Sequence, residues 1–113
     1  MIETLVLCSV NDVDQSLREI HRVLKPSGTF FFLDHIQAPV ENIWTLRIQN
    51  ILTNTIWPSL AGNCHLNRSI GKQIQDSGLF STTEMVEFTP VFTKFAMGIT
   101  KLIRFEIYGW ATK

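Results

Sequence analysis

An acidic residue and a histidine stand together directly after a short apolar run. The run, residues 29–33, reads Thr-Phe-Phe-Phe-Leu, and Asp34 and His35 follow it. Apolar character that is continuous rather than alternating is typical of a strand covered on both faces, and ligands of such sheets bind at the carboxyl ends of the strands. We therefore take both as candidate catalytic residues: His35 would deprotonate or orient a ligand and Asp34 would shape the pocket. The alternative is structural, with Asp34 capping the next segment and His35 packing through a hydrogen bond.

Two cysteines and the histidine that follows the second of them are further reactive side chains. Cys8 lies in an earlier apolar run, and Cys64 precedes His65 in a loop. Neither cysteine belongs to a Cys-x-x-Cys pair or has a histidine pair at metal-ligand spacing, so the sequence indicates no metal site. No adjacent base or helix start would lower the pKa of Cys8, which argues against a nucleophile there. Cys64 and His65 could line the substrate side of a pocket, or be a buried thiol beside a loop histidine.

The first third of the chain predicts a strand, a helix and a second strand. Residues 4–10 form an apolar run that predicts a strand buried on both faces. Asp12 can cap the helix that follows, and its apolar stripe comprises Val13, Leu17, Ile20 and Leu24. The helix should end at residues 26–28, where Gly28 is expected to have a positive φ. The two strands should be parallel neighbours.

The remainder of the chain predicts two helices and two strands. A helix over residues 41–57 should be closed by Pro58, and a helix over residues 69–77 should be ended by Gly78. Strands are expected at residues 83–88 and 103–111. Between them an apolar helical face could form a lid, from Phe92, Phe95, Ala96 and Ile99.

Residues 17–30 carry a resemblance to a known family. They read Leu-Arg-Glu-Ile-His-Arg-Val-Leu-Lys-Pro-Ser-Gly-Thr-Phe and resemble the helix, Lys-Pro-Gly-Gly turn and fifth strand of class I S-adenosylmethionine-dependent methyltransferases, with Ser27 replacing the first glycine. Residues 4–10 look like the fourth strand of that fold, and residues 107–113 look like the seventh. The chain is most similar to the small-molecule thiol methyltransferases of the methyltransferase-like group, which have a similar Leu-Cys-Ser-Val strand, an Asp-His or Glu-His pair and a Gly-Cys loop.

This resemblance implies an α/β fold. Residues 1–113 would be the carboxyl-terminal portion of a Rossmann-like methyltransferase domain, with strands four to seven of its seven-stranded sheet and the last strand antiparallel. By the same resemblance Cys8, Ser9 and Val10 would line the S-adenosylmethionine site. Cys64, His65 and Trp44 are the candidate substrate-binding residues.

The cofactor site implied by the family is incomplete in this sequence. In the family a glycine-rich turn after the first strand and an acidic residue after the second hold S-adenosylmethionine, and both would lie upstream of residue 1. The six glycines include no G-x-G, and close backbone approach to a cofactor needs glycine. We therefore expect this chain alone not to bind S-adenosylmethionine.

The resemblance implies transfer of a methyl group to a small-molecule acceptor, such as a thiol, by in-line displacement that requires no metal. Two alternatives stay open. The chain could be a non-catalytic fragment or isoform that acts as a binding or dimerising module and self-associates through the exposed edge of its first strand. It could also be an unrelated small α/β module with a different strand order.

The charge and the hydrophobicity of the chain limit the classes of partner that it can bind. The 113 residues contain 10 Lys and Arg and 10 Asp and Glu, for a formal net charge of zero, which argues against a nucleic-acid partner. No apolar run reaches the roughly 20 residues of a membrane span. We expect a cytoplasmic protein, or a membrane-associated one if an upstream region carries an anchor.

Overall fold

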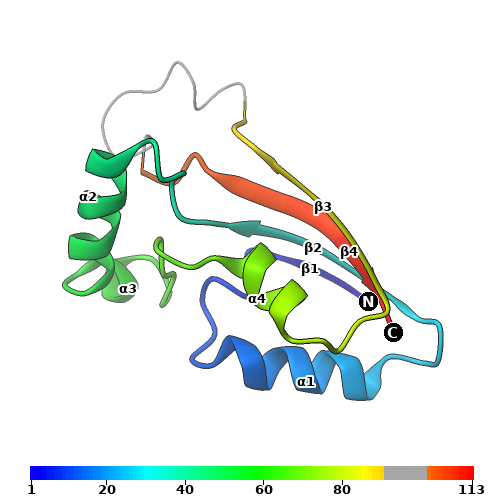
Figure 1. Ribbon diagram of the computed structural model, residues 1–113. Coiled ribbons are helices and arrows are strands. Elements are labelled where there is room, and N and C mark those ends of the chain that lie inside the picture. Colours follow the sequence, from blue (N-terminus) through cyan, green and yellow to red (C-terminus); the bar gives the residue numbers. More distant parts are fainter. Residues whose placement is uncertain (91–101) are drawn as a thin grey trace.

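The computed structural model describes residues 1–90 and 102–113 and shows four strands and four helices in that part of the chain (Figure 1). The predicted lid over residues 92–99 lies outside the described residues. In chain order the elements are β1 (Ile2–Thr4), α1 (Val13–Val23), β2 (Thr29–His35), α2 (Ile43–Thr53), α3 (Trp57–Leu60), α4 (Ile70–Asp76), β3 (Thr82–Phe88) and β4 (Glu106–Thr112).

The strands form one mixed sheet in the order β1-β2-β4-β3. β1 pairs parallel with β2, in a register that places Glu3 opposite Phe32. β4 is inserted between β2 and β3 and is antiparallel to both, with Ile107 opposite Asp34 on one side and Glu87 on the other. The predicted parallel pairing of the first two strands and the reversed last strand are both confirmed.

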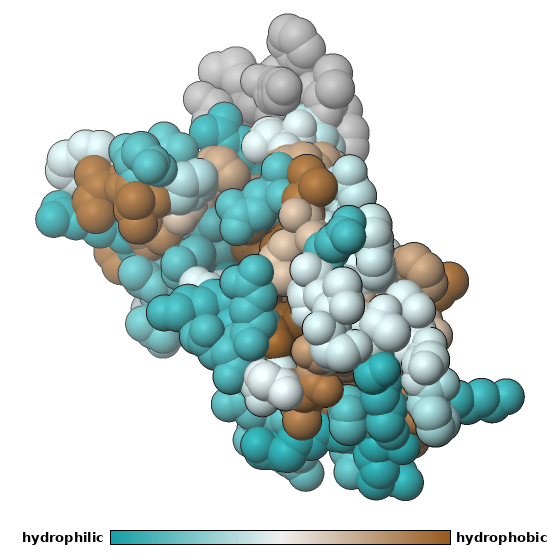
Figure 2. Space-filling view, turned by 45° about the vertical axis from the view of Figure 1, so that its right-hand side comes forward, coloured by the Kyte–Doolittle hydropathy of each residue, from teal (hydrophilic) through white to brown (hydrophobic). Residues whose placement is uncertain are grey.

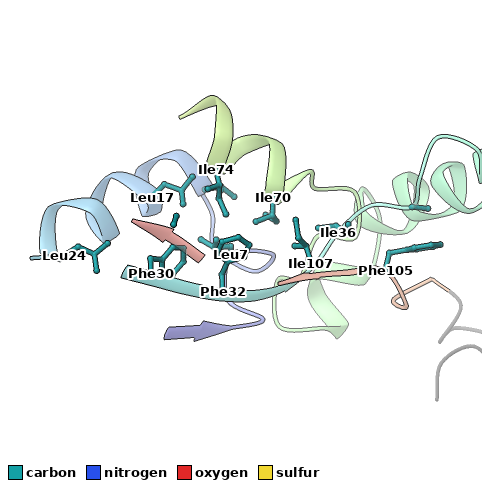
Figure 3. Close-up of a cluster of buried hydrophobic side chains, with 13 residues drawn as sticks. Leu7, Leu17, Leu24, Phe30, Phe32, Ile36, Ile70, Ile74, Phe105 and Ile107 are labelled. Atoms are coloured by element: carbon teal, nitrogen blue, oxygen red, sulfur yellow. The ribbon is translucent and has the colours of Figure 1, made fainter. Parts of the chain in front are cut away.

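The helices α1 and α4 cover one face of this sheet (Figure 3). Phe30 and Phe32 point into the core beneath them, with exposed fractions of 0% and 3%. Phe31, between them, is 47% exposed, and Trp110, which is paired with Phe31 in β4, is also exposed. The prediction that this strand is covered on both faces is therefore wrong at Phe31, whose side chain points to the opposite face from those of Phe30 and Phe32 and is nearly half exposed.

The strand predicted over residues 4–10 is wrong except at Thr4, because β1 spans Ile2–Thr4. β1 ends at Thr4, and Leu5 turns the chain with a φ of 58°. The amides of Ser9 and Val10 then donate to the Val6 carbonyl at 2.9 and 3.1 Å, so the end of the apolar run is a tight turn rather than a strand. The apolar pattern reflects burial of this loop, because Leu7 and Cys8 are each only 1% exposed.

The helix predictions were confirmed in part. The Asp12 side chain accepts a hydrogen bond from the Gln15 amide at the start of α1, as predicted. α4 lies within the predicted residues 69–77. The helix predicted over residues 41–57 is two helices, because α2 ends at Thr53, and Pro58 stands in the first turn of α3 instead of closing α2. This position suits proline, whose missing N–H is not needed there.

The turn between α1 and β2 differs from the prediction in one residue. Ser27, not Gly28, has the positive φ, at 60°. Gly28 is required for a different reason, since a Cβ at this position would lie 2.7 Å from the Lys25 carbonyl oxygen. The Gly28 amide donates to that same oxygen at 2.8 Å.

The helix α2 has a largely exposed apolar surface, which lies at the upper left of Figure 2. Its exposed large apolar side chains are Ile43, Trp44, Ile48 and Ile51. α2 has only 11 residues. Within residues 1–90 and 102–113, no helix combines the length and the apolar character needed to cross a membrane.

Candidate functional site

Asp34 organises the loop that follows β1. It is the penultimate residue of the strand β2, and its side chain is fully buried. Its two carboxylate oxygens each accept one backbone hydrogen bond, from the amides of Leu7 and Cys8, both at 3.0 Å. Asp34 therefore fixes the position of Cys8. The structural alternative expected Asp34 to cap the segment after β2, but its carboxylate instead holds the loop between β1 and α1.

Three reactive side chains meet beside this loop. The Cys8 Sγ, the Cys64 Sγ and a ring nitrogen of His35 all lie within 4.8 Å of one another. The Cys64 Sγ is 3.8 Å from the His35 Nδ1. Both cysteines are free and buried, and His35 is largely buried. We call these three residues the Cys-His-Cys cluster.

The cluster is held together by hydrogen bonds between the loop after β1 and the loop after α3. The His65 amide donates to the Cys8 carbonyl at 2.8 Å. The Asn63 side chain donates to the Ser9 carbonyl at 2.7 Å, and an Arg68 Nη1 donates to the Leu7 carbonyl at 2.7 Å. These contacts bring Cys64 to Cys8 although 55 residues separate them in the chain.

The two thiols of the cluster differ in acidity. Hydrogen bonding with Cys8 lowers the pKa of Cys64 to about 7, and the Trp57 indole and the Arg68 charge act in the same direction. The pKa of Cys8 is raised, first by its hydrogen bond with Cys64 and then by burial. Cys64 can thus be a thiolate near neutral pH, whereas Cys8 stays a thiol whose Sγ lies 3.6 Å from the Leu5 carbonyl oxygen.

His35 has a different neighbour at each ring nitrogen. Its Nδ1 faces Cys64, and its Nε2 lies 3.9 Å from the Glu106 Oε1. Hydrogen bonding to Cys8 is the main cause that raises the pKa of His35, while burial raises that of Glu106. Glu106 stands directly opposite His35 in the pairing of β2 with β4, so the sheet register fixes this contact.

Two comparisons with known proteins bear on the family. The methyltransferase-domain family matches residues 1–32. The human thiol S-methyltransferase TMT1A is 34% identical over 110 residues, which is 97% of this chain and 41% of that protein. The chain belongs to the methyltransferase family. This confirms the resemblance carried by residues 17–30.

Further relatives of this methyltransferase-family chain are also named thiol S-methyltransferases. Rat thiol S-methyltransferase TMT1B is 37% identical over 95 residues, which is 84% of the chain and 38% of that protein. The human TMT1B is 34% identical over 87 residues, or 77% of the chain and 34% of that protein. The chain therefore spans about two fifths or less of the length of these relatives.

The predicted site residues of this methyltransferase-family chain separate into two groups. Cys8, Cys64 and His35 come together in the cluster, and the Ser9 Oγ lies 3.4 Å from the Cys8 Sγ. Val10 packs against the main core and lines an open hollow of about 440 Å³ beside β1 and α1. The others are not part of the cluster: His65 contributes its backbone amide, and Trp44 is 73% exposed on α2, where it contacts Arg47.

A further carboxyl group near the loop was not singled out in the sequence. Glu3, in β1, accepts a hydrogen bond from the Val6 amide at 3.0 Å. Burial, followed by the charge and hydrogen bonding of Asp34, raises the pKa of Glu3 to about 8. No local pattern marks this residue, because its neighbour Asp34 belongs to another strand.

Proposed function

We propose that this chain supplies the acceptor-side portion of an S-adenosylmethionine-dependent methyltransferase domain, and that the complete domain transfers a methyl group to a small thiol. The observation that carries the proposal is the 34% to 37% identity to proteins named thiol S-methyltransferases, over 77% to 97% of the chain. The mixed sheet with a reversed strand inserted beside β2 supports an assignment of residues 1–113 to strands four to seven of the family fold.

The described residues do not by themselves fit S-adenosylmethionine. The carbonyl groups of Cys8 and Ser9, on the proposed cofactor wall, already accept hydrogen bonds from the His65 amide and the Asn63 side chain. The carbonyl of the preceding residue, Leu7, accepts one from Arg68. The sequence also contains no G-x-G turn that would let a backbone approach the cofactor closely. We therefore assign this chain one wall of the cofactor site and derive no step through the cofactor itself.

The acceptor side is where the residues of this chain would act. Methyl transfer to sulfur depends mainly on holding acceptor and methyl group in line. His35 is proposed to orient the acceptor, because its ring is held between Cys64 and Glu106 at the carboxyl end of β2. Asp34 is proposed as a positioning residue, because both of its oxygens are occupied by the loop amides.

A chimera tests the proposal. The region of human TMT1A that aligns with this chain would be replaced by residues 1–113, and S-methylated thiol and S-adenosylhomocysteine would be quantified by mass spectrometry. We expect both products in equal amounts from the chimera. A chimera that binds S-adenosylmethionine in isothermal titration but methylates no thiol would refute the assigned acceptor.

The chain alone provides the second arm of the same experiment. We expect no saturable binding of S-adenosylmethionine at micromolar concentrations, because polar contacts worth about 1 to 3 kcal/mol each would be missing. Saturable binding, or methyl transfer to any thiol, would show that the assignment of these strands is wrong.

A further inference from the structure

Within the described residues, the Cys-His-Cys cluster gathers three groups that are good ligands for a soft divalent metal ion. Thiolate and imidazole are the side chains that Zn²⁺ prefers, and two cysteines with one histidine are a known ligand set for a zinc site that keeps one position open. We propose that Cys8, His35 and Cys64 bind a Zn²⁺ ion and leave its fourth coordination position free for a further ligand.

The spacing of the three atoms is compatible with one tetrahedral ion. With Zn–S near about 2.3 Å and Zn–N near about 2.0 to 2.1 Å, ligand atoms on a tetrahedron are separated by about 3.6 to 3.8 Å. The Cys64 Sγ and His35 Nδ1 are 3.8 Å apart, and all three atoms lie within 4.8 Å of one another. To coordinate one ion, the three ligand atoms would therefore have to move closer together by about an ångström or less.

The surroundings of His35 orient it as a ligand. Metal-binding histidines commonly donate their second ring N–H to a carboxylate, which fixes the ring and leaves the other nitrogen free to bind the ion. Here the Glu106 carboxylate lies 3.9 Å from Nε2, and Nδ1 lies 3.8 Å from the Cys64 Sγ. The pairing of His35 with Glu106 across β2 and β4 makes this arrangement part of the sheet.

The charge and burial of the cluster also suit the ion. Two thiolates would neutralise Zn²⁺, which lowers the cost of placing the ion in a largely buried site. An apolar shell surrounds the two cysteines and includes Leu66, with Trp57, Ala61, Leu102 and Ile103 packed against it. Such a shell limits access of water to the metal.

The open position connects the site to the proposed thiol acceptor. A thiol that binds Zn²⁺ releases its proton to the solvent and binds as the thiolate, because the metal stabilises the thiolate. The acceptor of the proposed function would then be held as a thiolate by the ion. This identity of the fourth ligand rests on the proposed function, whereas binding of Zn²⁺ by the three side chains does not.

The test measures metal binding by the full chain without any methyl-transfer assay. The chain, kept reduced by a phosphine and shown to be folded by far-ultraviolet circular dichroism, would be titrated with Co²⁺ and then with Zn²⁺. We expect equimolar binding, a sulfur-to-cobalt charge-transfer band with visible bands of tetrahedral Co²⁺, and loss of these bands when Zn²⁺ displaces Co²⁺. A folded chain that binds neither ion at micromolar concentration refutes the proposal.

Variants identify the ligands. Cys64→Ser and His35→Gln should each abolish the tetrahedral spectrum, and Glu106→Gln should weaken Zn²⁺ binding by about 10-fold to 100-fold, as loss of a carboxylate behind a ligating histidine does. His21→Gln is the matched control, because His21 lies on α1 against Phe80. Equal binding by His35→Gln and the control would place the ion elsewhere and overturn the assignment.

The fourth position is tested separately with 2-mercaptoethanol. We expect this thiol to shift the visible bands of the Co²⁺-bound chain and to strengthen the charge-transfer band. Unchanged bands in excess thiol would refute the open position. Because this readout involves no S-adenosylmethionine, it remains informative if the chimera shows no methyl transfer.

Discussion

Replacement of Asp34 should show how strongly the loop after β1 depends on one carboxylate. Asp34→Ala removes the acceptor of two buried amides, those of Leu7 and Cys8. A buried donor without a partner costs about 1 to 3 kcal/mol, so we expect a loss of about 2 to 6 kcal/mol in the free energy of unfolding. Asp34→Asn keeps one acceptor oxygen and should cost about half as much.

The measurement is urea unfolding followed by far-ultraviolet circular dichroism. The matched control is Asp14→Asn, which removes an exposed carboxylate from the first turn of α1 and should cost no more than about 1 kcal/mol. A small domain is stable by about 5 to 15 kcal/mol in total, so the alanine variant could fall close to unfolding, and the asparagine variant then carries the comparison. If Asp34→Asn is as stable as the control, the loop does not depend on the two hydrogen bonds.

Three further predictions follow from the strands. Gly109→Ala should destabilise the fold by about 1 to 3 kcal/mol, because a Cβ there would lie 2.8 Å from the Met85 Cα; unchanged urea unfolding would contradict this close packing of β3 and β4. Because the pKa of Glu3 is raised from 4.5 to about 8, the folded state retains a proton that the unfolded state loses, so stability should fall as pH rises across that interval. Glu3→Gln should remove this part of the fall, and identical pH profiles would show that Glu3 does not hold the proton. Ile2, 78% exposed in the edge strand β1, is expected to promote self-association; Ile2→Lys should reduce the mass measured by light scattering at high concentration, and a monomer in both proteins would rule this surface out.

The elements with a complete local pattern could be predicted from the sequence. α1 has a cap, an apolar stripe and a stop signal within residues 12–28, and each of these acts between neighbouring residues. The strand predicted over residues 4–10 is wrong beyond Thr4 because an apolar run indicates burial and not backbone conformation. Leu7 and Cys8 are buried in a turn. The uncovered face of β2 could not be predicted either, since it depends on which helices pack there.

The sequence predicts which residues belong to the candidate site, but not that three of them lie close together. The residue types mark Cys8, His35 and Cys64 individually, but their spacing in the chain contains no local pattern of metal ligands. Their proximity arises from Asp34 and Arg68, which anchor the loop after β1 through its backbone. Such backbone contacts leave no mark in residue spacing, so the cluster and its Glu106 neighbour could only be found in three dimensions.

The position of β4 has a consequence for the order in which the sheet can be completed during synthesis. β4 is the last of the described elements to leave the ribosome, yet it lies between β2 and β3. Until it emerges, β3 has none of its hydrogen-bonding partners in the described sheet, and β2 exposes one edge. The two strand edges that β4 later pairs, one in β2 and one in β3, are therefore open at this stage, which favours pairing with other chains. Any truncation before residue 106 would make that stage permanent.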